Sequence, residues 1–479
     1  MNTTNQPTLL FHDYETWGVS PQKDHPSQFA AIRTDLDLNE IGSPENFYCQ
    51  VANDYLPHPV ASLLTGISPL QANRDGYCEA EFAGKIQRIM SEPQTCVVGY
   101  NSIRFDDEVT RYTFYRNFID PYAREWQKGN SRWDIIDLVR TCYALRPDGI
   151  TWPEKDDGSP SFKLEQLTAA NGISHADAHD ALSDVRATIA LARLVKQAQP
   201  KLYEYLFSLR DKRKVLNQLD LINHTPLVHI SSKLPARQGC CTLIMPLCMH
   251  PTNKNAIIVL NLQLDPTPLF ELDAPALLEK LYTASENLAP GEDRLPIKLI
   301  HINKCPAIAP LATLSDERAA QLGIDKQRCL AHWQSLKQNL HIMQKLQDMY
   351  EISRDDAPLD PDYALYTGGF FSDSDRYKME QIRQLPPAQL AGKDWQFDDP
   401  RLPVMLFRYR ARNYPESLSY DELQRWQQHR QLRLVDSQGQ YGLNLTNYMN
   451  ELALLAEQYQ HDAGKMRLLR DLQSYGANL

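Results

Sequence analysis

Two carboxylates follow an apolar run near the N-terminus and set the first constraint on the fold. The apolar stretch 9–11 leads into Asp13 and Glu15, which stand two residues apart. Side chains two residues apart in a β-strand point to the same face, so both carboxylates would project together from the end of a buried strand. Two like charges this close are unfavourable unless a cation lies between them, and a divalent metal ion with oxygen ligands meets that need. The alternative is a solvated strand end with two acids on its rim, and this pattern alone does not decide between the two.

Two later stretches bring further carboxylates to chain reversals. The stretch 97–106 has the pattern of an apolar strand, a short loop and then an aspartate, Asp106, at the start of a helix. The stretch 179–184 runs from His179 to Asp184 and leads into a long apolar helix pattern. The order D-x-E, N-x-x-x-F-D and H-x-A-x-x-D resembles the DEDDh family of 3′→5′ exonucleases, which includes polymerase proofreading subunits.

The resemblance extends over nearly the whole chain. The phrases that carry it are FHDYET, GYNSIRFDDEVTR, NSRWD, CYALRPDGI, HINKCP and FRYRARNYP. They are spread from residue 11 to residue 415 and are similar to the bacterial exonuclease I family of single-strand DNA exodeoxyribonucleases. This resemblance implies an α/β chain with a ribonuclease H-like exonuclease domain (a mixed sheet with flanking helices), an SH3-like β-rich domain and a helical C-terminal domain. We place these domains at residues 1–200, 201–354 and 355–479.

Local patterns predict the elements of each domain. In the first domain we expect strands at 8–15, 28–35, 46–51, 95–100 and 134–138, and helices at 79–90, 106–117, 162–170 and 182–197. Alternating strands and helices favour a mixed sheet with helices on its faces. After a helical stretch at 202–219 we expect short strands at 226–230, 241–247 and 255–264 and helices at 274–285 and 325–352. The C-terminal domain is predicted to be mostly helical, at 373–384, 401–412, 420–429 and 444–475.

Composition bounds the class of protein. The net charge of −10 argues mildly against a nucleic-acid partner, so a nuclease of this composition needs its basic residues gathered in a groove and metal ions at its site. No run approaches the roughly 18 apolar residues of a membrane span, and the N-terminus lacks the pattern of a signal peptide. Nine cysteines without a C-x-x-C pair predict free thiols. We therefore expect a cytoplasmic protein with no membrane contact, and the resemblance implies a monomer.

The resemblance implies a two-metal site for phosphodiester hydrolysis. Asp13 would bridge two Mg²⁺ ions, with Mn²⁺ as a substitute, Glu15 and Asp184 would complete the first, and Asp106 would hold the second largely through water. His179 would act as the general base, since the pKa of a histidine lies close to working pH.

A second reading of the third motif exists, because His175 precedes Asp180 with the same spacing as His179 precedes Asp184. Two observations favour the second pair: an alanine, Ala181, at the third motif position, and the long apolar helix that directly follows Asp184. We therefore expect His175, Asp177 and Asp180 to be solvated loop residues, and replacement of His175 by alanine to be nearly silent.

Candidate substrate contacts come from three stretches. Residues 111–140 interleave aromatic residues with arginines, the mixture that stacks bases and follows phosphates in single-strand grooves. The candidates there are Arg111, Tyr122, Trp126 and Arg140; the alternative is amphipathic helices with aromatic cores and solvated arginines. Ile67 lies in a loop that, in the related family, packs against the terminal base, although a turn covering the core explains it equally well. The resemblance adds Glu15, Thr16 and Lys163, the last in place of a usual arginine, so that the charge is kept but the bidentate fork is lost.

The helical C-terminal part contains a basic and aromatic cluster with Arg408, Arg410 and Arg412. It is either the wall of a groove or a helix whose arginines pair with nearby acids, and the sequence leaves both open. The resemblance also implies a partner, the acidic C-terminal tail of single-strand DNA-binding protein (SSB). Arg146 and Tyr205 match residues of that binding site, Lys337 replaces an arginine, and Ser315 stands where another arginine is expected.

The favoured function is a single-strand DNA exonuclease of DNA repair and recombination, acting 3′→5′ and releasing 5′-mononucleotides. The resemblance implies that the later domains arch over the site and form a channel that excludes duplex DNA. The alternatives are a DEDDh enzyme acting on RNA or on mispaired ends, and a non-catalytic adaptor that binds single strands and the SSB tail. The roughly 280 residues after the first domain speak against a proofreader or oligoribonuclease, which needs only that domain.

Overall fold

The computed structural model describes residues 6–175, 179–289, 293–352, 359–436 and 442–479. The chain divides into two compact units. The first consists of Met1–Ser131, His175–Arg186 and Asp356–Leu479, and the second of Arg132–Ser174 and Ala187–Asp355. The units therefore differ in extent from the three domains predicted along the sequence, because the C-terminal residues share one unit with the N-terminal ones.

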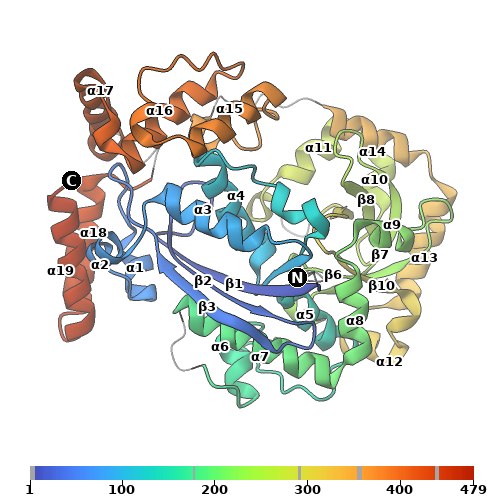
Figure 1. Cartoon of the computed structure of the whole chain (residues 1–479). Helices are drawn as coiled ribbons and strands as arrows, with labels where there is room; N and C mark the ends of the chain where they lie inside the picture. Colours follow the sequence, from blue (N-terminus) through green and yellow to red (C-terminus); the bar gives the residue numbers. More distant parts are fainter. Residues whose placement is uncertain (1–5, 176–178, 290–292, 353–358, 437–441) are drawn as a thin grey trace. The chain divides into compact units, whose positions relative to one another are not determined.

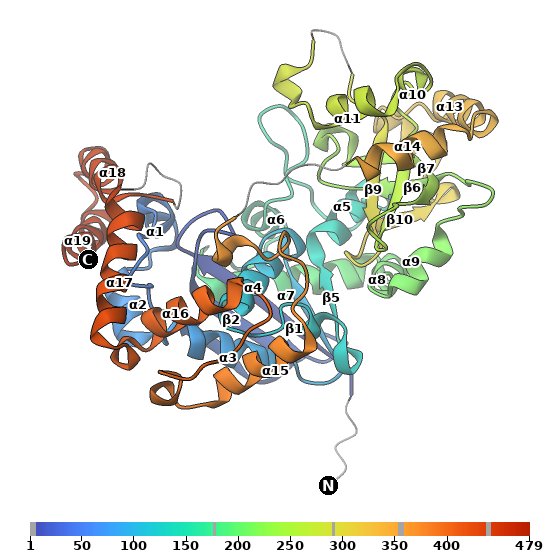
Figure 2. The ribbon, with the colours of Figure 1, turned by 90° about the horizontal axis from the view of Figure 1, so that it is seen from above.

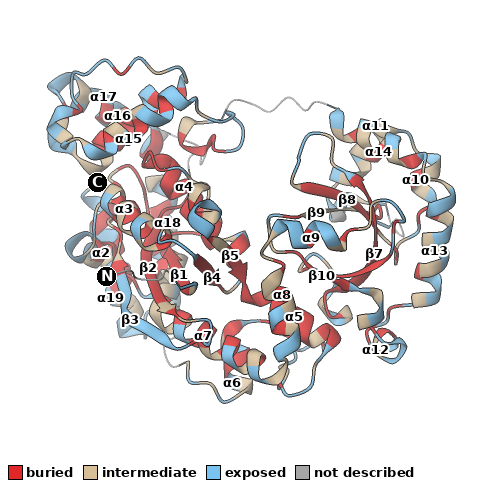
Figure 3. Ribbon diagram, turned by 45° about the vertical axis from the view of Figure 1, so that its right-hand side comes forward, coloured by how far each residue is buried: buried red, intermediate tan, exposed pale blue. Residues whose placement is uncertain are grey.

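The first sheet is built around its central strand β1. Its strands, in spatial order, are β3 (Glu40–Tyr48), β2 (Pro26–Thr34), β1 (Thr8–Thr16), β4 (Thr95–Gly99) and β5 (Ser131–Asp134), the last being where the chain passes into the second unit. β1 runs antiparallel to β2 and parallel to β4, with Phe11 opposite Ile32 on one side and Val98 on the other. A strand with neighbours on both sides and helices on its faces needs the continuous apolar run seen at 9–11. Figure 3 shows β1, β2 and β4 largely buried, while most of β3 is exposed.

Two helices of the first unit pack on this sheet (Figure 1). They are α3 (Glu79–Met90) and α4 (Asp106–Arg116), as the sequence predicts. Phe82 and Ile86 of α3 and Phe114 of α4 lie in one buried apolar cluster with Leu10 and Tyr14 of β1. The strand predicted at 134–138 is wrong. β5 ends at Asp134, whose side chain accepts a hydrogen bond from the Ile136 N–H at 3.0 Å and so begins a helix, α5 (Ile135–Leu145).

The C-terminal helices complete the core of the first unit. They are α15 (Asp373–Gln384), α16 (Arg401–Asn413), α17 (Tyr420–Gln431), α18 (Leu445–Gln458) and α19 (Ala463–Ala477). α18 and α19 pack with α1 (Pro59–Thr65), α19 also packs with α2 (Pro69–Asp75), and α16 packs with α3 (Figure 2). Met405 and Tyr409 of α16 share an apolar cluster with Tyr115 and Phe118. The single helix predicted at 444–475 is two, because the chain turns after α18 and Asp462 caps α19.

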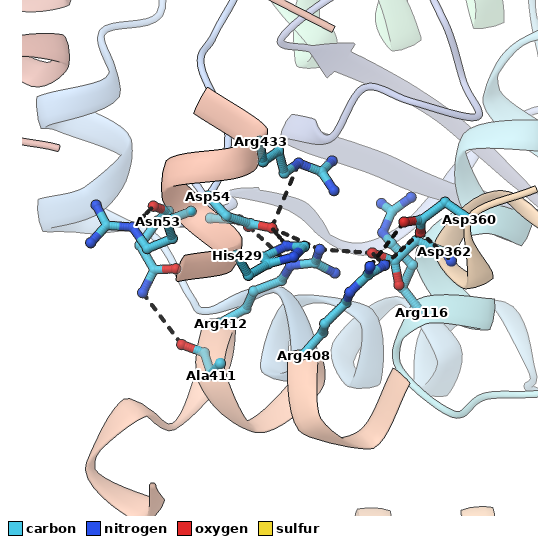
Figure 4. Close-up of polar contacts among 12 residues, drawn as sticks. Asn53, Asp54, Arg116, Asp360, Asp362, Arg408, Ala411, Arg412, His429 and Arg433 are labelled. Carbon is cyan, nitrogen blue, oxygen red and sulfur yellow. Dashed lines mark hydrogen bonds and ion pairs between the residues drawn. The ribbon is translucent and has the colours of Figure 1, made fainter. Parts of the chain in front are cut away.

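The arginines of α16 pair with acids, as the second of the two readings predicts. Arg408 bonds to Asp360 and Asp362, and Arg412 bonds to Asp54 and Asp362 (Figure 4). Arg410 forms a separate ion pair with Glu422. The three arginine side chains are only 10%, 6% and 5% exposed, so this cluster stabilises the packing of α16 and is not a basic groove wall.

The second unit contains an antiparallel sheet. Its strands, in spatial order, are β10 (Ala307–Pro310), β6 (Leu227–Ile230), β7 (Cys241–Met249), β8 (Ala256–Asn261) and β9 (Ile297–His301). The helices of this unit are α5, α6 (Leu164–Ala170), most of α7 (Ala181–Ala198), α8 (Pro200–Ser208), α9 (Lys212–Gln218), α10 (Thr267–Glu271), α11 (Ala274–Tyr282), α12 (Asp316–Gln321), α13 (Lys326–Gln338) and α14 (Ile342–Glu351). The predicted strands β6, β7 and β8 are confirmed, whereas β9 and β10 were not predicted. Within the described parts of the chain, no helix has the length and apolar character needed to cross a membrane.

Candidate active site

Asp13 and Glu15 leave β1 on the face opposite to the buried Tyr14. The Tyr14 ring packs against Phe29 and Phe82, with ring centroids 5.0 and 6.5 Å away. Because side chains alternate along a strand, burying Tyr14 on one face places both carboxylates on the other.

Asp106 is brought to the same strand by a sharp turn after β4. Gly99 ends β4, and a Cβ on this residue would lie 2.5 Å from the Cβ of Ser102, so only glycine lets the chain turn here. Asn101 follows in the left-handed region, with a φ of 62°, and α4 then begins at Asp106. The Tyr14 N–H donates a hydrogen bond to Oδ1 of Asp106 at 3.2 Å, which places this carboxylate beside β1.

Asp184 lies in the first turn of α7. The start of this helix is held by Asp180, whose carboxylate accepts a hydrogen bond from the Ser183 N–H at 3.1 Å and another from the Gln28 side chain at 3.1 Å. The prediction that Asp180 is a solvated loop residue is therefore wrong: its side chain caps the helix that carries Asp184. Asp177, predicted to be similar, lies outside the described residues.

Three carboxylates meet at this place. One oxygen from each of Asp13, Glu15 and Asp184 lies within 4.8 Å of the others. Burial and the neighbouring carboxylates, Asp106 first among them, raise the pKa of Asp13 well above its usual value. Burial, followed by the charges of Asp184 and Asp106, raises the pKa of Glu15 to about 9. Oxygen ligands whose negative charges repel one another fit a divalent cation, which would remove that repulsion.

The two histidines of the third motif lie differently from our expectation. The Nε2 of His175 is 2.5 Å from Oδ1 of Asp184, and its side chain is 5% exposed. His175 is thus not a solvated loop residue, and the sequence missed its contact because nine residues separate the partners and no local pattern joins them. His179 has a φ of 71° in the turn just before Asp180. Burial raises the pKa of Asp184, and the hydrogen bond with His175 opposes part of that rise. The role of His179 as general base stays a prediction.

The candidate substrate contacts at 111–126 separate into two kinds. Trp126 is 66% exposed, as a base-stacking residue must be. Arg111 is buried, with Nε and Nη2 bonded to the Glu125 carboxylate at 2.8 and 3.0 Å and Nη1 bonded to Glu108 at 2.8 Å. Two carboxylates bind this guanidinium in the DNA-free chain, and the DNA contact of Arg111 stays a prediction. The guanidinium carbon of Arg111 lies 5.2 Å from the ring centroid of the third candidate, Tyr122.

Two exposed aromatic residues near this stretch were missed. Phe370 is 84% exposed, and its ring centroid lies 6.1 Å from that of Tyr122. The Tyr366 hydroxyl accepts a hydrogen bond from Nη1 of Arg111 and donates one to Glu108. The only sequence signal was the aromatic pair at 370–371, about 250 residues from Tyr122, so its neighbourhood could not be inferred.

Ile67 and Thr16 are both engaged within the first unit. Ile67 is buried in an apolar cluster with Trp17, Tyr55 and Tyr475, which agrees with the alternative of a turn covering the core. The Thr16 hydroxyl donates a hydrogen bond to the Gly18 carbonyl at 2.6 Å. A substrate contact by either residue stays a prediction.

The remaining candidates belong to the second unit. Lys163 precedes α6, and its side chain is mostly exposed. Arg140 is buried and bonds to Asp137 at 2.8 Å. Arg146 and Tyr205 both contact residues 308–313: Arg146 donates to the Thr313 carbonyl at 3.0 Å and the Tyr205 hydroxyl to the Ile308 carbonyl at 3.1 Å.

The other two residues of the predicted partner site lie on helices of the same unit. Ser315 caps α12, and Lys337 lies on α13 with its ammonium 4.9 Å from the Trp333 ring centroid.

Comparison with known proteins supplies the family. Residues 10–192 match the family described as Exonuclease, residues 210–352 the Exonuclease I SH3-like domain, and residues 359–479 the Exonuclease I C-terminal domain. The chain is 48% identical over 474 residues to exodeoxyribonuclease I of Escherichia coli (strain K12), covering 99% of this chain and 98% of the relative. The chain belongs to the exonuclease I family. The exodeoxyribonuclease I of Haemophilus influenzae is 46% identical to it, with 98% of both chains covered.

Solved structures of this family agree over the same length. The complex of E. coli exonuclease I with a dA16 oligonucleotide matches with a TM-score of 0.94 at 48% identity, covering 99% of this chain and 100% of that one. The zinc-bound form of the E. coli exonuclease I–single-strand DNA complex matches with a TM-score of 0.92, covering 99% of both chains. The predicted fold class is thereby confirmed: an exonuclease domain with a mixed sheet, an SH3-like domain and a C-terminal exonuclease I domain. This member of the exonuclease I family is an enzyme, an exodeoxyribonuclease.

Proposed function

We propose that this chain degrades single-stranded DNA in the 3′→5′ direction, releases 5′-mononucleotides and acts in DNA repair and recombination. The observation that carries the proposal is the convergence of Asp13, Glu15 and Asp184 within 4.8 Å in a chain of the exonuclease I family. The E. coli relative in complex with single-stranded oligonucleotides supports DNA as the substrate.

The carboxylates would hold two Mg²⁺ ions, with Mn²⁺ as a substitute. Asp13 would contribute to both positions, Glu15 and Asp184 to the first, and Asp106 to the second. Bound there, the ions would stabilise the negative charge that develops on the phosphate and activate the attacking water. His179 would accept the proton of that water as a general base. The zinc-bound form of the E. coli relative supports a divalent cation in this family.

Exposed aromatic side chains would bind the DNA strand without recognising its base sequence. Trp126 and Phe370 are the exposed candidates, and every base has a face on which an aromatic ring can stack. The Tyr122 ring lies beside Phe370 and near the Arg111 guanidinium, which pairs with Glu125. These contacts would hold the exposed rings of Trp126 and Phe370, the stacking platform, in place. α4 joins the platform to the catalytic centre, since Asp106 begins the helix and Arg111 lies five residues later, about 7–8 Å along its axis.

We also propose a monomer in the cytoplasm that binds the acidic tail of SSB. The shared contacts of Arg146 and Tyr205 with residues 308–313 support one binding site, to which Arg146 would present a positive charge. Titration with the tail peptide tests this: Arg146→Ala should weaken binding, while Lys254→Ala, at an exposed lysine between β7 and β8, should leave it unchanged.

The deciding experiment is a nuclease assay with 5′-labelled oligonucleotides. We expect a ladder of products shortened from the 3′ end of single-stranded DNA, little cleavage of RNA, and no cleavage in EDTA. A duplex with a 3′ overhang should be shortened to the junction and then stall. Asp13→Ala should lose cleavage by several orders of magnitude but still bind the strand. Equal rates on RNA would favour a broader nuclease, and binding without cleavage by the parent protein would favour the adaptor.

A further inference from the structure

We infer that His175 is a positioning residue of the metal site, which orients the Asp184 carboxylate through a hydrogen bond from its Nε2. The inference rests on the proposed function, because it assigns Asp184 to a bound cation. It adds a second histidine to the site, with a role distinct from that of His179.

The contact between the two side chains is close and enclosed. Nε2 of His175 lies 2.5 Å from Oδ1 of Asp184, and the two side chains are 5% and 19% exposed. A hydrogen bond of this length from an enclosed imidazole restricts the carboxylate to one orientation, whereas the first turn of a helix by itself leaves a short side chain several.

The bond also leaves Asp184 able to serve as a ligand. A carboxylate has two oxygens and about four sites that accept a hydrogen bond or a cation, and His175 uses one of them. The donor on Oδ1 offsets part of the repulsion from Asp13 and Glu15, whose oxygens lie within 4.8 Å of a carboxylate oxygen of Asp184. Groups that hydrogen-bond a metal-binding carboxylate orient it in this way, and their loss commonly lowers metal affinity 10–100-fold.

Both ends of Asp184 are therefore held by parts of the chain that precede it. Its backbone N–H bonds to the Asp180 carbonyl at 3.0 Å, in a helix start that Asp180 also caps with its side chain. Its carboxylate bonds to His175. The backbone hydrogen bond fixes the position of the Asp184 main chain, and the side-chain hydrogen bond fixes the orientation of its carboxylate.

The test measures metal affinity in the absence of DNA. Binding of Mn²⁺ to the full chain is followed by the electron paramagnetic resonance signal of free Mn²⁺, for the parent, His175→Ala, His175→Gln and His461→Ala. We expect His175→Ala to weaken binding about 10–100-fold. His175→Gln should recover most of the affinity, because the glutamine amide can donate from nearly the position of Nε2. His461→Ala, at an exposed histidine before α19, should bind as the parent does.

A double-mutant cycle shows whether His175 acts through Asp184. In an Asp184→Ala background, His175→Ala should cause no further loss, since its partner is already gone. Additive losses, or full affinity in His175→Ala, would overturn the inference while leaving the metal site in place. A parent that bound no Mn²⁺ would overturn the metal site and this inference together. Equal affinities of His175→Ala and His175→Gln below that of the parent would also overturn it, because a donor at this position would then be irrelevant.

Discussion

Arg412 and Asp54 form a buried, two-point ion pair between the C-terminal and N-terminal residues of the first unit (Figure 4). Nε of Arg412 lies 3.0 Å from Oδ1 of Asp54, and Nη2 lies 2.8 Å from Oδ2. The same Nη2 donates to Asp362 at 2.7 Å. His429 and Arg433 lie 3.3 and 3.7 Å from Oδ2 of Asp54, the oxygen that also accepts from Nη2 of Arg412. This network joins residues that lie more than 350 positions apart in the sequence.

Removing Arg412 should destabilise the fold strongly. Arg412→Met leaves Asp54 and Asp362 buried without their main counter-charge, which costs about 3–5 kcal/mol of the free energy of unfolding. Urea unfolding of the full chain measures the loss. Arg74→Met is the matched control: Arg74 pairs with Asp75 on the surface, and its loss should cause no measurable change. Equal effects of the two substitutions would contradict a structural role for the buried network.

The same acids should make the fold sensitive to low pH. Burial raises the pKa of Asp54, but the charges of Arg412 and Arg433 outweigh it and hold that pKa well below its usual value. Burial likewise raises the pKa of Glu79, but the charges of Arg116 and His25 outweigh it, so the pKa of Glu79 also lies well below its usual value. The unfolded chain therefore takes up more protons than the folded one as the pH falls.

The stability that these acids contribute is complete above about pH 5 and is lost as the pH falls through about 4, the unfolded-state value, and below. Free energies of unfolding from pH 7 to pH 3 should show this fall, and it should be shallower in Asp54→Asn. Asp316→Asn, at an exposed acid, should keep the slope of the parent. A slope in Asp54→Asn as steep as in the parent would show that Asp54 contributes nothing to it.

Neutralising one carboxylate of the active site should stabilise the metal-free protein. Asp13→Asn removes a carboxyl group whose ionised form is disfavoured by burial and by Asp106, Glu15 and Asp184, so its thermal midpoint in EDTA should rise, consistent with a gain of about 0.5–2 kcal/mol. Added Mn²⁺ should raise the midpoint of the parent, because it binds the folded state, but hardly that of the variant. Glu457→Gln, at an exposed acid on α18, serves as control. A lower midpoint for Asp13→Asn in EDTA would show that the carboxylates attract other groups more than they repel one another.

Substitutions of His175 and His179 should change different quantities, the metal affinity for His175 and the rate for His179. His179→Ala should lower kcat about 10²–10⁴-fold, the usual effect of losing a general base, with Mn²⁺ affinity kept. Single-turnover rates on a short oligonucleotide, with Mn²⁺ saturating, measure this. If His179→Ala lost metal affinity and kept its rate at saturating Mn²⁺, our assignment of the general base would be wrong.

The exposed aromatic residues should govern how tightly the strand is held. Trp126→Ala should weaken single-strand binding by about 1–3 kcal/mol, the worth of one stacked base, and leave the cleavage rate at saturating DNA nearly unchanged. Binding of a labelled oligonucleotide to the Asp13→Ala background measures affinity without cleavage. Tyr420→Ala, at an exposed aromatic residue of α17, is the control. Equal affinities of the Trp126 and Tyr420 variants would exclude Trp126 from the binding surface.

Features encoded within one element could be predicted from the sequence. The apolar run before Asp13 and Glu15 predicted a central strand with two carboxylates on one face, and both properties depend only on neighbours one or two residues away. The helices α3 and α4 were likewise predicted, at 79–90 and 106–117, within one residue of their observed bounds. The order of the three acidic motifs along the chain was also enough to identify the family.

The partner of each charged side chain was decided only by the tertiary structure. The sequence suggested Arg111 as a phosphate contact and left the partner of Arg412 open. In the fold, Arg111 forms an ion pair with Glu125, and Arg412 forms one with Asp54. His175 was set aside because its spacing to Asp180 duplicated a motif, yet the turn before α7 brings it to Asp184. A charge acts over a few ångströms in any direction, so its nearest opposite charge depends on how distant segments pack. Strand and helix periods, by contrast, are properties of the local backbone, and they can be read from the sequence alone.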